Sequence, residues 1–463
     1  MHYKLGSACS EIFSSDTIFF KSHRLSSRQE AETIVKGAKL LEKTLPGSVE
    51  LSIQSSIIDE QLDKPVGATN GIMLRYDQLR LEPWIEPIWI GSAQLEELGA
   101  LVLLQQRILL SEGMCLVDAR PSNYWLGSKQ PRMVDLASIK DLSQHSLASF
   151  LADFLRHFIQ PLLLEQQLGL AVGSYYEAGL ESQDLRLGGL LSSYTYWPMA
   201  KELVRQSLTR RMSALVSSAS VDFIRFLSDL GSCEAKDGKL NRSLKSHATR
   251  RLNRMELLLK KASPGRNKTK SDWSQYAQVH DPNYTAIKQK AIEEFLAESP
   301  KDSGVVDLGA NLTTASHQEV SLLIDQDLSV CREIWALRGG DAHVLQLDVA
   351  KALASPGSEA FKVLNLGGSY QEAMVLGLVH HLQIDAGLAP DAFYRGLSQL
   401  YKRVLLEFPN RDDPMVQLLM RKRGENLLWS WENQQINAER YFTVNFSKKL
   451  SETRHVAYLE AIK

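Results

Sequence analysis

Short apolar runs alternate with amphipathic segments throughout the second half of the chain. Residues 284–298 have the apolar spacing of a helix. The runs that follow predict strands at 305–307, 319–324, 344–347, 373–378 and 404–408. Two β-rich runs within 441–462 predict an antiparallel hairpin at the sheet edge. Because helical segments separate the strands, we expect residues 272–463 to form an α/β domain with a parallel, doubly wound sheet.

The first half of the chain is dominated by helical patterns. Leucines recur at helical spacing between residues 95 and 110, and short strand candidates follow at 115–117 and 132–134. Residues 147–232 carry broad leucine and aromatic stripes, which indicate helices packed in a core. We therefore expect residues 1–238 to form a separate, mainly helical α+β domain.

Lysines and arginines crowd the segment between these halves. Residues 239–270 contain a single acidic residue, Glu256, and the stretch 263–271 has the composition of a linker. The plain interpretation of 239–271 is a solvated basic helix followed by a linker. The alternative is a patch for an anionic ligand, such as a phosphorylated or acidic glycan or a nucleic acid.

The composition narrows the classes of function. The 463 residues carry a formal net charge of −1, which gives no global reason to expect nucleic-acid or membrane binding. No segment offers the run of about 20 uncharged apolar residues that a membrane span needs, and the N-terminus lacks the apolar core of a secretion signal. The cysteines are far apart and show no metal-ligand spacing. These observations predict a cytoplasmic protein of two or three domains with no metal site.

The most informative stretch is 305–311, Val-Val-Asp-Leu-Gly-Ala-Asn, which a second apolar run ending at Asp325 follows. An apolar strand, a glycine turn, a helical segment and a second strand ending in a carboxylate form a nucleotide-binding βαβ unit. Gly309 lets the backbone approach a ligand closely because it has no Cβ. Asp325 stands where a carboxylate accepts ribose hydroxyls. The pattern predicts a nucleotide-containing cofactor.

Residues 272–463 resemble class I S-adenosylmethionine-dependent methyltransferases, in particular a bacterial family related to a rhizobial nodulation protein. The segments that carry the resemblance are 305–311, 324–327, 345–348, 378–382, 406–409 and 413–416. It implies a Rossmann-like fold and S-adenosyl-L-methionine as the cofactor.

The resemblance also implies roles for individual residues. Gly309 and Asn311 would lie in the loop that meets the methionine part of the cofactor, with Asp307 near its amino group. Asp325 would accept the ribose hydroxyls, and Asp348 a hydrogen bond from the adenine amino group. The alternative for each carboxylate is a helix cap or turn residue at a strand end.

His380 and His381 follow the fourth predicted strand, where the sheet opens towards the transferable methyl group. A histidine suits the removal of a proton from a hydroxyl or ammonium acceptor, and we expect His381 to be the more exposed of the pair. The alternative is that one ring packs or holds a loop. Glu407, at the end of the fifth strand, is interpreted as a structural carboxylate bonded to backbone donors.

A second resemblance covers residues 95–140. Asp118 and Asn123, followed by Asp135, have the order of the catalytic loop and metal-binding aspartate of protein kinases and small-molecule phosphotransferases. Residues 1–90 contain no convincing glycine-rich loop, and only Lys21 and Lys36 are loose candidates for the nucleotide-binding lysine. We interpret this half as an inactive kinase-like domain that helps to bind the acceptor.

The sequence as a whole predicts methyl transfer to an oxygen or nitrogen of a small-molecule, sugar or specialised-metabolite acceptor. Thr313 stands where relatives have glycine, which supports an alternative: a non-catalytic scaffold with degenerate enzyme domains. A bifunctional kinase–methyltransferase is another alternative. A nucleic-acid methyltransferase that uses the basic segment is disfavoured by the near-neutral charge.

Overall fold

The computed structural model describes most of the chain. The described residues are 2–3, 10–14, 18–25, 28–49, 55–58, 72–79, 85–126, 131–145, 147–180, 238–263, 282–300, 304–312, 314–338, 342–423 and 429–462. They belong to two compact units. The first comprises Met1–Glu82, Gln94–Leu126 and Gln130–Pro264, and the second Pro83–Ala93, Gly127–Lys129 and Gly265–Lys463. The basic segment up to Pro264 thus groups with the first unit, whereas the functional division at residues 238 and 271 stays a prediction.

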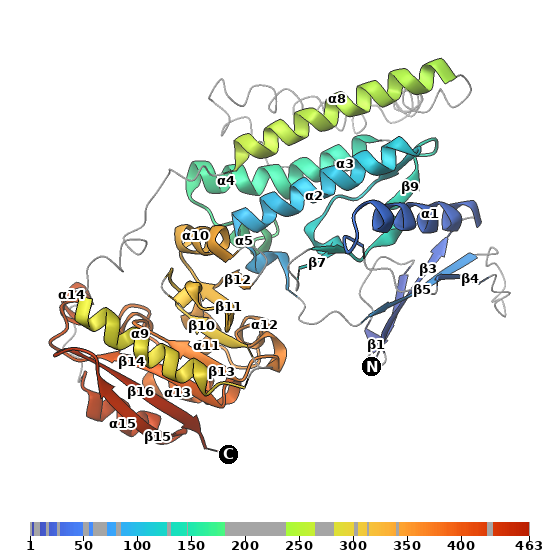
Figure 1. The fold of residues 1–463 in the computed structure, drawn as a ribbon. Helices are drawn as coiled ribbons and strands as arrows, with labels where there is room; N and C mark the ends of the chain where they lie inside the picture. The colour runs from blue at the N-terminus through green and yellow to red at the C-terminus, as the bar shows by residue number, and fades with distance from the viewer. Residues whose placement is uncertain are drawn as a thin grey trace. The chain divides into compact units, whose positions relative to one another are not determined.

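The second unit is built on a seven-stranded sheet of order β12-β11-β10-β13-β14-β16-β15 (Figure 1). The strands are β10 (Val305–Leu308), β11 (Val320–Asp325), β12 (His343–Gln346), β13 (Glu372–Val375), β14 (Arg403–Pro409), β15 (Phe442–Lys449) and β16 (Arg454–Ala461). The first five run parallel, and β16 pairs antiparallel with both β14 and β15. The predicted parallel strands and the predicted edge hairpin are confirmed.

Helices connect and cover these strands. They are α9 (Pro282–Ala297), α10 (Leu328–Arg338), α11 (Val349–Ala354), α12 (Glu359–Val363), α13 (Pro390–Leu400), α14 (Pro414–Arg423) and α15 (Trp431–Ala438), with short turns η1 (Pro87–Trp89), η9 (Thr314–Ser316), η11 (Leu366–Gly368) and the π-helix η12 (His381–Asp385). The predicted helix at 284–298 is confirmed as α9, which starts at Pro282 because a proline ring suits the first helical turn. Ile292 and Phe295 of α9 pack with Val305 and Leu323 in the core of this unit.

The first unit contains a five-stranded antiparallel sheet of order β1-β2-β3-β5-β4. The strands are β1 (His2–Tyr3), β2 (Ser10–Ser14), β3 (Ile18–Leu25), β4 (Ser55–Ile58) and β5 (Ile72–Leu79), with helix α1 (Arg28–Thr44) between β3 and β4. The local sequence around Lys21 shows no clear strand, yet this loose candidate lies on β3, where it pairs with Ile12 of β2 and Tyr76 of β5. These strands mix serines and charged residues with apolar ones, so the local pattern hides them.

The rest of the first unit is mainly helical, as predicted for the described residues. Its elements are α2 (Ser92–Ser111), β6 (Met114–Leu116), η2 (Pro121–Asn123), β7 (Tyr124–Trp125), β8 (Arg132–Met133), η3 (Leu136–Ser138), β9 (Ile139–Asp141), α3 (Leu147–Phe154), the π-helix η4 (Leu155–Ile159), α4 (Gln160–Leu168), α5 (Val172–Glu177) and α8 (Gly238–Ala262). The predictions for 181–237 lie outside the described residues. The predicted helix at 95–110 is confirmed as α2, and the strand candidates as β6 and β8.

The basic segment begins as helix α8, which docks by an apolar face. Leu252, Met255 and Leu259 are buried, and a Cβ added to Gly99 of α2 would lie 3.2 Å from Leu259. The predicted linker from residue 264 onward lies outside the described residues.

None of the described helices is long and apolar enough to cross a membrane. Within the same residues, no group of His, Cys, Asp and Glu side chains is arranged to hold a metal ion.

Candidate functional site

The carboxyl ends of the parallel strands bring the predicted cofactor residues to one edge of the sheet. Asp307 lies on β10, Asp325 ends β11, and Asp348 follows β12. The strand order reverses between β10 and β13, and ligands of doubly wound sheets bind in the crevice at such a reversal. Residues that are distant in sequence therefore line the same edge.

Gly309 forms a tight turn directly after β10. Its φ of +73° is in the left-handed region, and its N–H donates to the Ile324 carbonyl at 2.8 Å. A Cβ at this position would lie 3.0 Å from both methyl carbons of Leu378. Only glycine meets both demands without strain, so the turn offers the close backbone approach that a bound cofactor needs.

Asp307 is a buried carboxylate of which one oxygen accepts a hydrogen bond and the other does not. The Thr314 hydroxyl donates to Oδ2, whereas Oδ1 has no hydrogen-bond partner among the described residues. Burial raises the pKa of Asp307 to about 6, against the opposing effects of the Thr314 hydrogen bond and the Lys288 charge. A buried acceptor without a donor is costly unless a ligand supplies one. An ammonium group would suit this oxygen, and the predicted contact with the amino group of a cofactor stays a prediction.

Asn311 orders the loop between Gly309 and η9. Its Oδ1 accepts from the Thr314 N–H at 3.3 Å, and its carbonyl accepts from the Ala315 N–H at 3.0 Å. These bonds place the Thr314 hydroxyl against Asp307, so the loop holds the carboxylate in position. Thr313, which departs from the methyltransferase pattern, lies outside the described residues.

Asp325 is a partly buried carboxylate at the tip of β11. Burial raises its pKa to about 7, and the charges of Asp327 and Asp307 act in the same direction. One oxygen accepts from the Asp327 N–H at 2.6 Å. Because ribose hydroxyls donate hydrogen bonds, they suit this acceptor. Its predicted role fits this environment and stays a prediction.

Asp348 performs the alternative role considered from the sequence. Its carboxylate caps α11 by accepting from the Lys351 N–H at 3.2 Å, and the Lys351 ammonium lies 3.7 Å from its other oxygen. A helix cap of this kind stabilises the start of α11. The predicted contact with the adenine amino group stays a prediction.

His380 and His381 enter the π-helix η12 with ring centroids 4.1 Å apart. His380 is fully buried, and neither of its ring nitrogens has a hydrogen-bond partner within the described part of the chain. Burial, followed by the neighbouring His381, Arg454 and Lys288, holds the pKa of His380 well below its usual value. Burial lowers the pKa of His381, the more exposed of the pair as expected, to about 4. Both rings are neutral near pH 7 and are weak bases.

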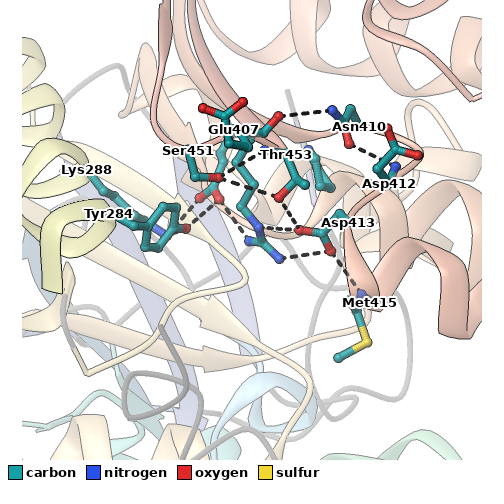
Figure 2. A network of polar contacts seen from close by, with 12 residues as sticks. Tyr284, Lys288, Glu407, Asn410, Asp412, Asp413, Met415, Ser451 and Thr453 are labelled. Carbon is teal, nitrogen blue, oxygen red and sulfur yellow. Dashed lines mark hydrogen bonds and ion pairs between the residues drawn. The ribbon is translucent and has the colours of Figure 1, made fainter. Parts of the chain in front are cut away.

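Glu407 is bound by side chains rather than by the expected backbone donors, which corrects the interpretation of this residue. Its carboxylate is fully buried and lies 2.6 Å from the Tyr284 hydroxyl, 2.8 Å from the Lys288 ammonium and 2.9 Å from Nη1 of Arg454 (Figure 2). Burial would raise its pKa, but the two cations prevail and lower it to about 2. This network lies at the carboxyl end of β14, and no local sequence pattern predicts its members on α9 and β16.

Asp413 extends the network into the loop before α14. Arg454 donates to its two oxygens, at 2.8 Å from Nε and 3.3 Å from Nη2, and the Met415 N–H donates at 3.0 Å. Figure 2 shows this carboxylate between the start of α14 and the turn that carries Thr453. The network thus joins the loop after β14 to the β15–β16 turn.

The first unit brings its predicted residues together as well. The Asn123 amide donates to the Asp118 carbonyl at 3.2 Å, and the Asn123 carbonyl accepts from the Asp135 N–H at 3.3 Å. The Asp118 carboxylate pairs with Nε of Arg120 at 2.7 Å, a partner that the sequence did not predict. Lys36 is an exposed residue 3.7 Å from Glu112, which leaves Lys21 as the lysine on a strand.

No protein-family model and no curated protein matches the chain. Among solved structures, it is similar to the PH0226 protein from Pyrococcus horikoshii OT3, with 13% identity, a TM-score of 0.29, and coverage of 41% of this chain and 99% of that one. A structure of WbdD, described as a bifunctional kinase-methyltransferase, has 18% identity, a TM-score of 0.25 and coverage of 39% of each chain. The small RNA methyltransferase HEN1 has 10% identity, a TM-score of 0.27, and coverage of 46% of this chain and 30% of that one. The chain thus spans well under half of the latter two proteins.

Proposed function

We propose that the second unit is a methyltransferase that uses S-adenosyl-L-methionine. The observation that supports this most is the turn at Gly309, where a positive φ and the nearby Leu378 require a glycine and the adjacent Asp307 keeps a buried oxygen for a donor. Asp325 on the next strand offers a second acceptor. This arrangement suits a ligand that combines a cationic amino-acid end with a ribose.

Each residue has a defined task in this proposal. The cofactor, when bound, supplies an electrophilic methyl group. Gly309 and Asn311 shape the loop against its methionine part, and Asp307 holds its ammonium. Asp325 accepts the ribose hydroxyls, and Asp348 accepts from the adenine amino group with the lone pairs that the α11 cap leaves over.

His381, the more exposed ring, binds and orients the acceptor rather than removing its proton, and the fully buried His380 packs against it. Because both imidazoles are neutral and weakly basic, each offers one N–H donor and one ring-nitrogen acceptor. Alignment of the attacking atom is the main requirement of methyl transfer. The acceptor atom is an oxygen or nitrogen of a small molecule, sugar or specialised metabolite, and it loses its proton to solvent or to its own neighbouring groups.

Calorimetric titration with S-adenosylhomocysteine tests the proposal without knowledge of the acceptor. We expect binding in the micromolar range and its loss in Asp325→Ala. Glu359→Gln is the matched control because this carboxylate is exposed on α12 and its removal leaves the predicted site intact. Absence of binding in the folded wild-type chain would favour the degenerate scaffold instead.

A second candidate function, nucleotide-dependent phosphoryl transfer, is favoured by one specific feature of the first unit. The sheet places Lys21 on β3, directly before α1, and the separate loop joins Asp118, Asn123 and Asp135. A lysine on the third strand and a helix carboxylate, together with this loop, are the parts that protein kinases use. In this role Asn123 and Asp135 would hold magnesium, which supplies charge neutralisation on the phosphates.

Thermal shift with ATP and magnesium distinguishes this function from an inactive kinase-like domain that only helps to bind the acceptor. Phosphoryl transfer predicts a shift that Asp135→Asn and Lys21→Met abolish. The exposed Lys36→Met is the matched control. A wild-type chain that gives no shift and no ATP turnover would leave the inactive domain as the preferred interpretation.

A further inference from the structure

The residues assigned to the cofactor so far include no cation for its carboxylate. Asp307, Asp325 and Asp348 are all acidic, and they suit the ammonium, the ribose and the adenine amino group. The methionine part of the cofactor also ends in a carboxylate. A carboxylate beside the buried Asp307 is costly unless a cation or several N–H donors accompany it.

Lys288 is a buried cation close to this position. It lies on α9 with a relative exposure of 8%, and lysine is rarely buried without a specific partner. Its ammonium is 2.8 Å from Oε2 of Glu407 and 3.5 Å from the Tyr284 hydroxyl. Glu407 stands on β14, the second strand from β10, two residues beyond Leu405, which is level with Asp307 across β13. The charge of Lys288 also lowers the pKa values of Asp307, His380 and Glu407.

Arg454, the other cation of the network, already binds two carboxylates. Arg454 uses Nε and Nη2 on Asp413 and Nη1 on Glu407, so its guanidinium is held in one plane by two carboxylates. An ammonium carries three protons, and Glu407 and Tyr284 are the partners of Lys288 among the described residues. Figure 2 shows Lys288 and Tyr284 approaching Glu407 from α9. Lys288 can therefore donate one further hydrogen bond to a ligand.

We infer that Lys288 binds the carboxylate of the cofactor's methionine part, with Glu407 and Tyr284 as positioning residues that hold the ammonium in place. This inference rests on the proposed methyltransferase function. Asp307 and Lys288 then form a matched pair, in which an anion meets the ligand's ammonium and a cation meets its carboxylate. The buried ion network at the end of β14 thereby gains a role in cofactor recognition beyond stability.

Two ligands that differ only in the carboxylate test the inference. S-Adenosylhomocysteine has it, and the decarboxylated analogue has a plain aminopropyl chain on the same sulfur. We expect the wild-type chain to bind the analogue roughly tenfold or more weakly than S-adenosylhomocysteine, because the analogue lacks one charge-assisted hydrogen bond. Equal affinities for the two ligands would overturn the inference.

Substitution at Lys288 completes the test. Lys288→Met should weaken S-adenosylhomocysteine binding to the level of the analogue and leave analogue affinity within about twofold of the wild-type value. Lys290→Met, an exposed lysine on the same helix, should change neither. Equal weakening of both ligands would show a purely structural role and contradict the inference. If Lys288→Met does not fold, Lys288→Met/Glu407→Gln removes the buried pair together, and the wild-type comparison decides independently. A folded wild-type chain that binds neither ligand would instead overturn the proposed function.

Discussion

The ammonium of Lys288 and the carboxylate of Glu407 lie 2.8 Å apart, with side-chain exposures of 10% and 0%. Arg454 contacts the same carboxylate from the opposite end of the second unit's sequence. Two cations therefore share one fully buried anion. Buried ion networks cost desolvation energy, and breaking one by removal of a single partner costs more than the network contributes.

Glu407→Gln is expected to destabilise the second unit strongly. The amide keeps the shape of the side chain but leaves two buried cations without their shared anion, at a cost of about 3–5 kcal/mol. Urea unfolding monitored in the far ultraviolet measures this loss. Glu359→Gln, which removes a carboxylate paired with Lys362 on the surface of α12, should change stability by less than about 0.5 kcal/mol. Comparable losses in both variants would contradict the network's importance.

The contribution of Glu407 should also depend on pH. Its pKa in the folded chain, about 2, lies below the ordinary value of 4.5, so its stabilising effect is present above pH 4.5. The effect is lost as pH falls from 4.5 through 2, where the folded carboxylate takes up its proton. The stability gap between wild type and Glu407→Gln should therefore narrow across this window. A constant gap measured by urea unfolding at several pH values would refute the assignment.

Asp325 should affect the pH dependence of stability in the opposite direction to Glu407. Burial raises its pKa from 3.8 to about 7, so the folded chain holds this proton more tightly than the unfolded chain. The resulting stability is present below pH 3.8 and is lost as pH rises through 7. Asp325→Asn removes a costly buried charge and should stabilise the chain at pH 8, on the order of 1–3 kcal/mol. Near pH 4, the two proteins should unfold at similar urea concentrations.

Gly309→Ala should weaken cofactor binding. The added Cβ strains a backbone with φ of +73° and meets Leu378 at 3.0 Å, so the turn must shift. Gly387 provides a matched control, since its φ is +72° and an added Cβ finds open space. Both variants should lose about 1 kcal/mol of stability from the backbone strain. Only Gly309→Ala should lose S-adenosylhomocysteine affinity by calorimetry, and equal affinities in the two variants would contradict the role of this turn.

The histidine pair should remain neutral at physiological pH. Burial keeps the pKa of His381 near 4 and that of His380 well below its ordinary value. Nuclear magnetic resonance of the imidazole signals, assigned with His380→Gln and His381→Gln, should show no titration of either ring between pH 5 and 8. A midpoint near 6.5 for either ring would restore the general-base role predicted from the sequence.

The local sequence was sufficient to predict the parts of this site that follow one another along the chain. The strand, glycine turn and second strand around Gly309 and Asp325 are a continuous βαβ unit, whose apolar periodicity and turn residue are both local signals. The edge hairpin was equally readable because two β-rich runs flank a short polar turn.

The missing parts depend on contacts between distant segments. Tyr284 meets Glu407 across 123 positions, and Arg454 meets Glu407 across 47. No local pattern shows which helix face covers the end of β14, so the sequence does not distinguish Lys288 from a solvated lysine. The strand that carries Lys21 was missed for a related reason: antiparallel pairing with β2 and β5 satisfies its backbone, and its mixed polar composition gives no periodicity.

We propose that the edge of the seven-stranded sheet binds S-adenosyl-L-methionine. Calorimetric titration of the intact chain with S-adenosylhomocysteine, with Asp325→Ala as the comparison, decides whether it does. We predict micromolar affinity in the wild-type chain and no measurable binding in the variant. A folded wild-type chain that releases no heat of binding, or a variant that binds as well as the wild type, would contradict it.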